Sequence, residues 1–325
     1  MKHRIGNIKL DGRFVLAPLA GVNDIAFRKM CSDYGSALNF SEMINVNAIE
    51  RLNKSTLKMA DTFENEKCFI QLFGTRLDAI KKSIKILENE YDKCTPYGFD
   101  FNFGCPVSKI MNQGAGSALL KRPKKIGEIL SVMRDSTDLP ITAKIRLGIT
   151  PKSANYLETA KIIERNGADA LVVHGRYQSQ GYSGTADWGK IKEIVDVVDI
   201  PVIANGDIVD EFSANKIIEE TCCKFGMIGR AIMGNPFLFK RLNHFMETHE
   251  ILEQKNKIDL FLEYLSLVDN FCLIKDNYVK FSYVKTHAMW FTKGIPNSAI
   301  LRDKISLVDN INDLSEMFKK HQIDM

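Results

Sequence analysis

Short apolar runs alternate with segments of helical periodicity from residue 13 to about residue 230. The runs predict eight strands, at residues 13–19, 37–41, 68–74, 99–103, 141–145, 170–174, 202–205 and 224–228. The segments between them predict helices, one capped by Asn23-Asp24 and others at residues 46–60, 77–90, 123–135, 152–166, 187–198 and 210–221. This alternation is typical of a parallel sheet, and eight such units in about 240 residues match an α/β fold of the (β/α)₈ TIM-barrel type. A doubly wound open sheet is the alternative fold.

Polar side chains lie at or just past the carboxyl ends of the predicted strands. They are Gln71, Asn102, Lys144, His174, Asn205 and the pair Gly229-Arg230. In a barrel these strand ends converge on one face, where catalytic residues are found. The pattern therefore favours the barrel and predicts an active site at its mouth.

Beyond Asn235-Pro236 the alternation stops, and helical spacing predicts four helices at residues 237–250, 256–274, 278–291 and 298–322. We therefore expect two domains, a catalytic barrel at residues 1–240 and a small helical bundle at residues 241–325. Positive charge gathers in the bundle, where Asp276 and Asp303 are opposed by Lys275, Lys280, Lys285, Lys293, Arg302 and Lys304. Aromatic residues such as Tyr278 and Trp290 are interleaved with these cations. The mixture suits RNA binding through phosphate contacts and base stacking, and an ordinary helical face is the alternative.

Composition is that of a globular protein, with 325 residues, 45% of them hydrophobic, and a net charge of +4. No apolar run approaches the roughly 18 residues of a membrane span, and the N-terminus lacks the apolar core of a signal peptide. The seven cysteines include no C-x-x-C pair, so we expect neither a zinc site nor a disulfide framework. Reduced thiols indicate a cytoplasmic protein. We expect no metal, no membrane association and a monomer.

Cys105 follows a predicted core strand and precedes Pro106 and a glycine-bearing loop. A buried structural cysteine is the ordinary interpretation of a single thiol. The polar neighbours Asn102, Ser108 and Lys109 do not suit an apolar core, so we place Cys105 in the active site.

Two glycine pairs, Gly206-Asp207 and Gly229-Arg230, follow the last two strands, where barrels commonly hold a phosphate. We expect Lys144 to point into the same mouth of the barrel. It could act as a Schiff-base lysine or as a cation beside a reduced flavin. With Gln71 and His174 it describes a pocket for a flat polar ring with a phosphate tail, and flavin mononucleotide (FMN) fits that description. No G-x-G-x-x-G follows a strand, so a Rossmann dinucleotide domain is not expected.

The motifs together resemble the tRNA-dihydrouridine synthase family over nearly the full chain. They are Ala17–Asp24, Gln71–Gly74, Asn102–Lys109, Gly114–Leu120, Lys144–Gly148, Val173–Arg176 with Tyr182, Ala204–Asp207, Met227–Arg230, Gly234–Pro236, and Lys285–Gly294 with Leu301-Arg302. The departures are small: Asn23 stands where the family usually has Thr, and Phe103 where it usually has Met.

The resemblance implies FMN as prosthetic group, NADPH as reductant, and reduction of the C5–C6 double bond of uridines in tRNA. It implies Cys105 as proton donor, and Asn102, Arg146 and Tyr182 as contacts of the substrate uracil. By motif position the FMN residues would be Pro18, Leu19, Ala20, Gln71, Lys144, His174, Asn205, Gly206, Asp207, Gly229 and Arg230. We further expect the helical domain to hold tRNA phosphates through Lys285, His287, Lys293 and Arg302.

Three other functions remain open at the level of sequence. An FMN barrel could act on a free pyrimidine, as a reductase or dehydrogenase. Lys144 could serve a Schiff-base aldolase. The chain could also be an RNA-binding protein that keeps an inactive barrel. Bound flavin and the response to tRNA distinguish these functions.

Overall fold

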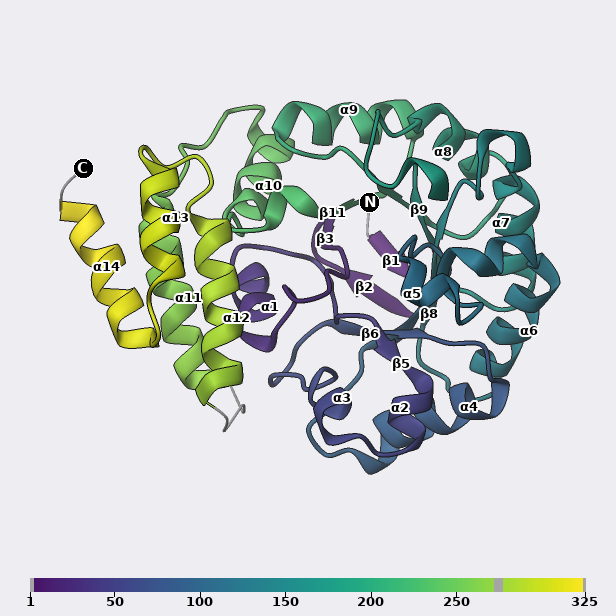
Figure 1. The fold of residues 1–325 in the computed structure, drawn as a ribbon. Helices are drawn as coiled ribbons and strands as arrows, with labels where there is room; N and C mark the ends of the chain where they lie inside the picture. The colour runs from purple at the N-terminus through teal and green to yellow at the C-terminus, as the bar shows by residue number, and fades with distance from the viewer. Residues whose placement is uncertain (1–2, 272–276, 324–325) are drawn as a thin grey trace.

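The computed structural model describes residues 3–271 and 277–323 (Figure 1). Lys275 and Asp276, which contribute to the predicted basic stretch, lie outside the described residues. None of the described helices combines the length and the apolar character that a membrane span requires.

Eight parallel strands form a barrel, as predicted (Figure 1). They are β3 (Phe14–Leu16), β4 (Asn39–Phe40), β6 (Cys68–Phe73), β7 (Gly98–Asn102), β8 (Ile141–Arg146), β9 (Ala170–His174), β10 (Val202–Asn205) and β11 (Phe225–Ile228). From β4 to β11 each strand pairs with its neighbour in this list, and β11 pairs with β3, so β3 and β4 are the two ends of the sheet. Between β3 and the segment before β4, Ala37 N donates to Phe14 O at 2.9 Å and Leu16 N to Leu38 O at 3.0 Å. These two bonds bring the ends of the sheet together.

Along each strand, successive side chains point alternately to the interior and to the outside of the barrel. On β7, Phe99 and Phe101 point outward into the apolar layer beneath the helices, whereas Asp100 and Asn102 alternate with them and face the interior. Around the barrel lie α1 (Ile25–Asp33), α4 (Leu77–Lys85), α6 (Pro123–Arg134), α7 (Tyr156–Arg165), α8 (Trp188–Val195), α9 (Glu211–Thr221) and α10 (Leu238–Thr248).

Several short elements differ from the sequence prediction. An N-terminal hairpin, β1 (His3–Ile5) and β2 (Ile8–Leu10), was not predicted. Its Ile5 and Leu10 are buried with Phe40 and Phe69 in the barrel interior, which the hairpin closes at one end. The predicted helix at 46–60 is two helices, α2 (Val46–Glu50) and α3 (Lys54–Lys58), that follow β5 (Ile44–Asn45). They are separated at Leu52, which has a φ of +54°.

Further helices are also shorter or divided. The predicted helix at 77–90 is α4 followed by a π-helical turn at Ile86–Glu90. The last predicted helix is divided into α13 (Ser298–Ser306) and α14 (Ile311–Ile323). Helical periodicity continues across such breaks because it reports which face is apolar, and not where the backbone turns.

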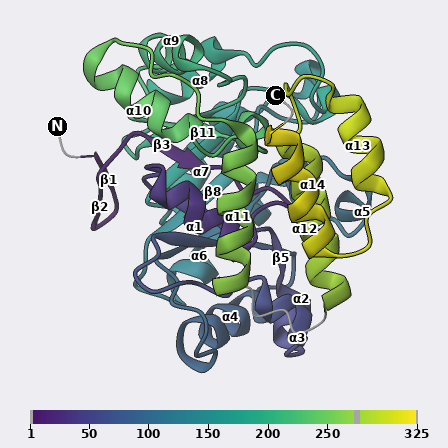
Figure 2. The ribbon, with the colours of Figure 1, turned by 90° about the vertical axis from the view of Figure 1, so that its left-hand side faces the viewer.

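The C-terminal region contains α11 (Lys257–Phe271), α12 (Asn277–Phe291), α13 and α14, and α11, α12 and α14 run beside one another (Figure 2). Helix α10 instead packs against α9 and β3 of the barrel, and its Asn243 Nδ2 donates to Gly35 O at 2.8 Å. Residues 241–248, which the predicted boundary at 240/241 assigns to the helical domain, therefore lie in a helix of the barrel.

The helical region is joined to the barrel where α11 packs against α1. His287 of α12 is only 1% exposed, and its Nε2 lies 2.8 Å from Asp24 Oδ2 at the N-cap of α1. Tyr264 Oη of α11 donates to the same carboxylate oxygen at 2.9 Å, and its ring centroid lies 4.3 Å from that of His287. The ring of Phe27 also packs against the imidazole, at 5.0 Å between centroids. This polar contact inside an aromatic cluster fixes the helical region on the barrel.

Candidate active site

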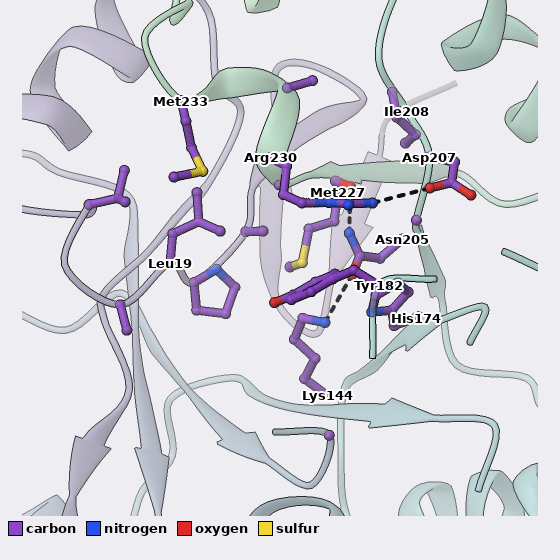
Figure 3. Close-up of a pocket in the computed structure, with 18 of the residues that line it drawn as sticks. Leu19, Lys144, His174, Tyr182, Asn205, Asp207, Ile208, Met227, Arg230 and Met233 are labelled. Carbon is purple, nitrogen blue, oxygen red and sulfur yellow. Dashed lines mark hydrogen bonds and ion pairs between the residues drawn. The ribbon is translucent and has the colours of Figure 1, made fainter. Parts of the chain in front are cut away.

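A cavity of about 910 Å³ opens at the carboxyl ends of the strands. It brings together all eleven residues predicted for FMN, and also Cys105, Asn102, Arg146, Tyr182 and Lys293 (Figure 3 shows part of the lining). The helical region contributes Lys257, Trp290, Lys293 and Gly294 to the same wall. The site is therefore built mainly by the barrel and completed by α11, α12 and the turn after α12.

Lys144 lies on β8 with its ammonium beside Asn205, whose Oδ1 accepts a hydrogen bond from Nζ at 3.0 Å (Figure 3). Asn205 Nδ2 donates in turn to Met227 O at 2.8 Å, so its amide orientation is set by the neighbouring strand. Burial, with Arg146 nearby, lowers the pKa of Lys144 to about 8. The side chain is still largely cationic at neutral pH, but it is a weaker base than a lysine exposed to solvent.

His174, at the end of β9, is buried beside Gly206. A Cβ at position 206 would approach the His174 ring to 3.0 Å, and Gly206 has a φ of +119°, so this close approach requires glycine. Burial and the cations Lys144 and Arg146 hold the pKa of His174 well below its usual range. The imidazole is therefore neutral at pH 7, with one nitrogen as donor and one as acceptor.

Asp207 follows with a φ of +60° and binds two arginines. Its Oδ2 accepts from Arg176 Nη2 at 2.8 Å and from Ala186 N at 2.7 Å, and Oδ1 accepts from Arg230 Nη2 at 3.4 Å. Arg176 also donates to the carbonyls of Ser183 and Gly184. Asp207 thus anchors the loop at residues 175–187 and restrains Arg230 at the cavity mouth.

Tyr182 is carried by that loop near two guanidinium groups. The residue is 58% exposed, and its ring centroid lies 4.8 Å from Arg230 Cζ and 5.7 Å from Arg146 Cζ. Arg146 donates through Nε to Gly104 O at 3.1 Å, and through Nη1 to Tyr177 O and Gly181 O at 3.0 and 2.8 Å. Arg146 therefore joins the loop of Tyr182 to the loop of Cys105.

Cys105 is 8% exposed and is the one cysteine of the described residues that lines the cavity. Its N–H donates to Asn102 Oδ1 at 2.8 Å, and its carbonyl accepts from Ser117 N at 3.0 Å. Burial raises the pKa of the Cys105 thiol, against the opposing effects of the Val107 N–H and the nearby cations Arg146 and Lys144. The thiol is therefore protonated at neutral pH, as a proton donor must be.

Gly116 explains why a glycine-rich segment follows Cys105. It has a φ of +57°, and a Cβ there would come 2.8 Å from Cys105 O and 3.1 Å from Cys105 Cβ. The chain therefore returns beneath the thiol at van der Waals distance, and a side chain at position 116 would displace it.

A family model described as "Dihydrouridine synthase (Dus)" matches residues 15–323, which is nearly the whole chain. The chain belongs to this family. Dihydrouridine synthases are oxidoreductases, so the protein is an enzyme of that class.

Relatives named for the same activity span most of the chain. A "Probable tRNA-dihydrouridine synthase" of Rickettsia bellii is 33% identical over 313 residues, covering 94% of this chain and 94% of its own length. A "tRNA-dihydrouridine synthase B" of Pasteurella multocida is 33% identical and covers 94% and 91%. The protein of the same name from Proteus vulgaris is 37% identical over 250 residues, covering 77% of this chain and 76% of its own.

The fold of the chain is also similar to solved structures of other proteins. A 2-naphthoyl-CoA reductase superposes with a TM-score of 0.58 at 14% identity, covering 74% of this chain and 51% of that one. A histamine dehydrogenase from Rhizobium sp. 4-9 gives 0.55 at 14% identity, covering 82% and 50%. At this identity the likeness concerns the fold alone.

The cations predicted to bind tRNA occupy different environments in the structure. Lys293 is exposed at the cavity wall, and Arg302 is partly exposed on α13. Lys285 donates from Nζ to Ser306 O and Val308 O, both at 2.8 Å, and so ties α12 to the end of α13. His287 is buried against Asp24, so a phosphate cannot reach it, and we correct its predicted role to a structural one.

The sequence interpretation assigned no role to several residues of the site. Asp100 lies below Gln71, Arg176 holds the loop of Tyr182, and Met43 and Lys257 line the cavity. Asp100 was detectable, because it stands two positions before Asn102 and so faces the same side of the strand. The place of Lys257 in the cavity was not detectable, because a helical pattern does not show which neighbour a helix face will contact. Trp290, predicted only as one of the aromatic residues of the basic stretch, also lines the cavity. Within the described residues, no group of His, Cys, Asp or Glu side chains could hold a metal ion.

Proposed function

We propose that this protein reduces the C5–C6 double bond of uridine in tRNA, with FMN as prosthetic group, NADPH as reductant and Cys105 as proton donor. The observation that supports this most directly is that one cavity is lined by the protonated thiol of Cys105, the buried ammonium of Lys144 and the neutral imidazole of His174. The relatives named tRNA-dihydrouridine synthase support the choice of substrate.

The residues present fit FMN. The Lys144 ammonium can donate three hydrogen bonds, and the described structure records one acceptor for it, Asn205 Oδ1. It is therefore suited to an electronegative edge of the ring. A Cβ at Gly229 would meet nothing nearer than 3.8 Å, which leaves room above the backbone, and the exposed guanidinium of Arg230 stands beside it. Backbone N–H groups and an arginine at this end of a barrel suit a phosphate.

Of the residues that line the cavity, Pro18, Leu19 and Ala20 would lie against FMN, and Gln71, Lys144 and His174 would offer it polar contacts. Asn205, Gly206, Gly229 and Arg230 would hold its phosphorylated chain, while Asp207 would act through Arg230. Bound there and reduced by NADPH, FMN would supply the hydride for C6 of the uracil.

Cys105 then delivers the proton to C5. Its Sγ holds that proton because burial keeps the thiol neutral. Asn102 and Arg146 orient the uracil beside the thiol, and Tyr182 offers an exposed ring over which a base can stack. The target uridine must leave its stack in tRNA to reach this depth.

An anaerobic absorbance experiment tests the function. Purified protein should show a flavin spectrum that bleaches with NADPH and recovers on addition of unmodified tRNA, but not of free uridine. Dihydrouridine should appear in the tRNA in proportion. A flavin that is reoxidised by free uracil and ignores tRNA would support the free-pyrimidine alternative. A protein that binds no FMN on reconstitution would refute the proposed cofactor.

We place the tRNA backbone along the accessible cations of the helical region, chiefly Lys293 and Arg302. Replacing either by alanine should weaken tRNA binding several-fold, because each neutralised phosphate releases counterions. The slope of log K against log salt concentration should become shallower by about 0.7–0.9 for each phosphate that is no longer neutralised. Lys81→Ala, at an exposed lysine on α4, is the matched control. Slopes equal to that of the control would place the tRNA elsewhere.

A further inference from the structure

Asp100 is a fully buried carboxylate directly beneath the cavity, and the mechanism above does not use it. It lies on β7 and faces the barrel interior between β6 and β8. Its Oδ2 accepts a hydrogen bond from Gln71 Nε2 at 2.6 Å, and its Oδ1 accepts one from Thr142 Oγ1 at 2.6 Å. Both oxygens are thus engaged by neighbouring strands.

A chain of hydrogen bonds leads from this carboxylate to Cys105. Gln71 Oε1 accepts from Asn102 Nδ2 at 2.9 Å. Asn102 Oδ1 then accepts from Gly104 N at 3.1 Å and from Cys105 N at 2.8 Å. Four residues, Asp100, Gln71, Asn102 and Cys105, are joined from the barrel interior to the active-site loop.

The two ends of the chain determine the orientation of both amides. Backbone N–H groups of Gly104 and Cys105 can only donate, so they require the oxygen of Asn102. The carboxylate of Asp100 accepts, so it requires the nitrogen of Gln71. Reversing either amide would place nitrogen against N–H at the loop or oxygen against oxygen at the acid. In this orientation Asn102 Nδ2 also donates to Met43 Sδ, at 3.9 Å.

We propose that Asp100 is a positioning residue for the reaction: it fixes the amide of Gln71 and, through Gln71, the amide of Asn102 that holds the Cys105 loop. This inference rests on the proposed function, and it adds a residue that acts without touching substrate or cofactor. Loss of the carboxylate frees Gln71 to reverse, which removes the partner of Asn102 Nδ2 and loosens its hold on the Cys105 backbone.

The charge of the carboxylate is consistent with this role. Burial raises the pKa of Asp100 to about 6, although hydrogen bonds from Thr142 and Gln71 and the cation Lys144 act in the opposite direction. Above that pH both oxygens are acceptors only, which is the state that permits a single orientation of Gln71. An asparagine at position 100 carries a donor of its own, so it permits either orientation.

The test is Asp100→Asn in the FMN-loaded protein, read first by alkylation of individual cysteines with iodoacetamide and mass spectrometry. Alkylation of Cys105 should become several-fold faster, while Cys94 and Cys223, buried elsewhere, should react as in the unmodified protein and report that the fold is intact. The rate of uridine reduction should fall by up to about 100-fold, the effect of a small misplacement of a reacting group. The tRNA dissociation constant should be unchanged, because the cations proposed to bind tRNA, Lys293 and Arg302, lie outside this chain of hydrogen bonds.

Thr142→Val is the matched control, because it removes the other hydrogen bond to the same carboxylate and leaves Gln71 in place. In the Thr142→Val variant, the rate of Cys105 alkylation and the rate of uridine reduction should equal those of the unmodified protein. If Asp100→Asn lowers the yield of folded protein, Gln71→Met interrupts the chain one residue nearer the loop. With saturating FMN, and with bound FMN confirmed by its absorbance, Gln71→Met should give the same rise in Cys105 alkylation. Unchanged Cys105 alkylation in a folded Asp100→Asn or Gln71→Met variant overturns the inference. Alkylation needs no tRNA, so failure of the proposed function appears separately, as absence of dihydrouridine with the unmodified protein.

Discussion

Replacing Cys105 by alanine is expected to abolish most of the uridine reduction while FMN stays bound. Removing a general acid typically lowers the rate by about 10²–10⁴-fold. The thiol contributes no contact that the cofactor residues need, because its loop is held through backbone groups by Asn102 and Ser117. The measurement is a single turnover of the NADPH-reduced variant with unmodified tRNA, with the flavin spectrum recorded before and after.

Cys222→Ala is the control for loss of a thiol as such, since Cys222 is exposed at the end of α9 and does not line the cavity. It should turn over at the rate of the unmodified protein. An alanine variant at position 105 that keeps its rate would remove Cys105 from the mechanism, and a variant that loses its flavin would give the thiol a structural role instead.

Replacing Asp24 by alanine is expected to loosen the helical region from the barrel and to lower the free energy of unfolding by roughly 2–4 kcal/mol. One part is the removal of the N-cap of α1, where Asp24 Oδ1 accepts from Phe27 N at 2.9 Å. The larger part is the removal of an acceptor for Tyr264 and His287 inside the interface. Urea unfolding gives the magnitude, and limited proteolysis at residues 249–256 reports release of the helices.

The matched control is Asp33→Ala at the other end of α1, where the carboxylate pairs with Lys29 at the surface. An exposed pair of this kind contributes about 1 kcal/mol or less. Equal destabilisation by the two variants would show that the buried contact does not hold the interface.

The Asp24 contact also predicts the response to acid. Burial by itself would raise the pKa of Asp24, but His287 and the hydrogen bonds from Phe27 and Tyr264 outweigh it and hold that pKa below its usual range. An acid with a depressed pKa stabilises the fold above its ordinary value, near 3.9, and this contribution disappears as the pH falls through the lower folded value. The difference in stability between the protein and Asp24→Ala should therefore diminish below about pH 4.

This interface changes how the tRNA-binding surface can be tested. Deleting the helical residues would expose Phe27 and the rest of the α1 face that α11 covers, so a truncated barrel would be destabilised for reasons unrelated to tRNA. Single substitutions at Lys293 and Arg302 avoid this problem because both side chains have access to solvent.

The core of the barrel was predictable because its signals are local. Period-two alternation on β7 separates Phe99 and Phe101 from Asp100 and Asn102 within five residues. The hairpin β1–β2 gives no such local signal, because its three-residue strands are too short to show a period. The burial of its residues depends instead on the end of the barrel that the hairpin covers.

The order of strands and helices, and the polar residues at the strand ends, could be predicted from the amino-acid pattern because parallel strands must bring those ends to one face. The pattern also located Cys105 and the glycines of the cavity, since a turn or a close approach constrains the residue type at its own position.

Which polar groups meet one another depends on the folded chain. His287 and Lys293 belong to one basic stretch, yet one is buried against Asp24 and the other lines the cavity, because helical periodicity does not name the surface that a face will contact. The role proposed for Asp100 likewise depends on the tertiary structure, because only the barrel brings its partners Gln71 on β6 and Thr142 on β8 within hydrogen-bond distance.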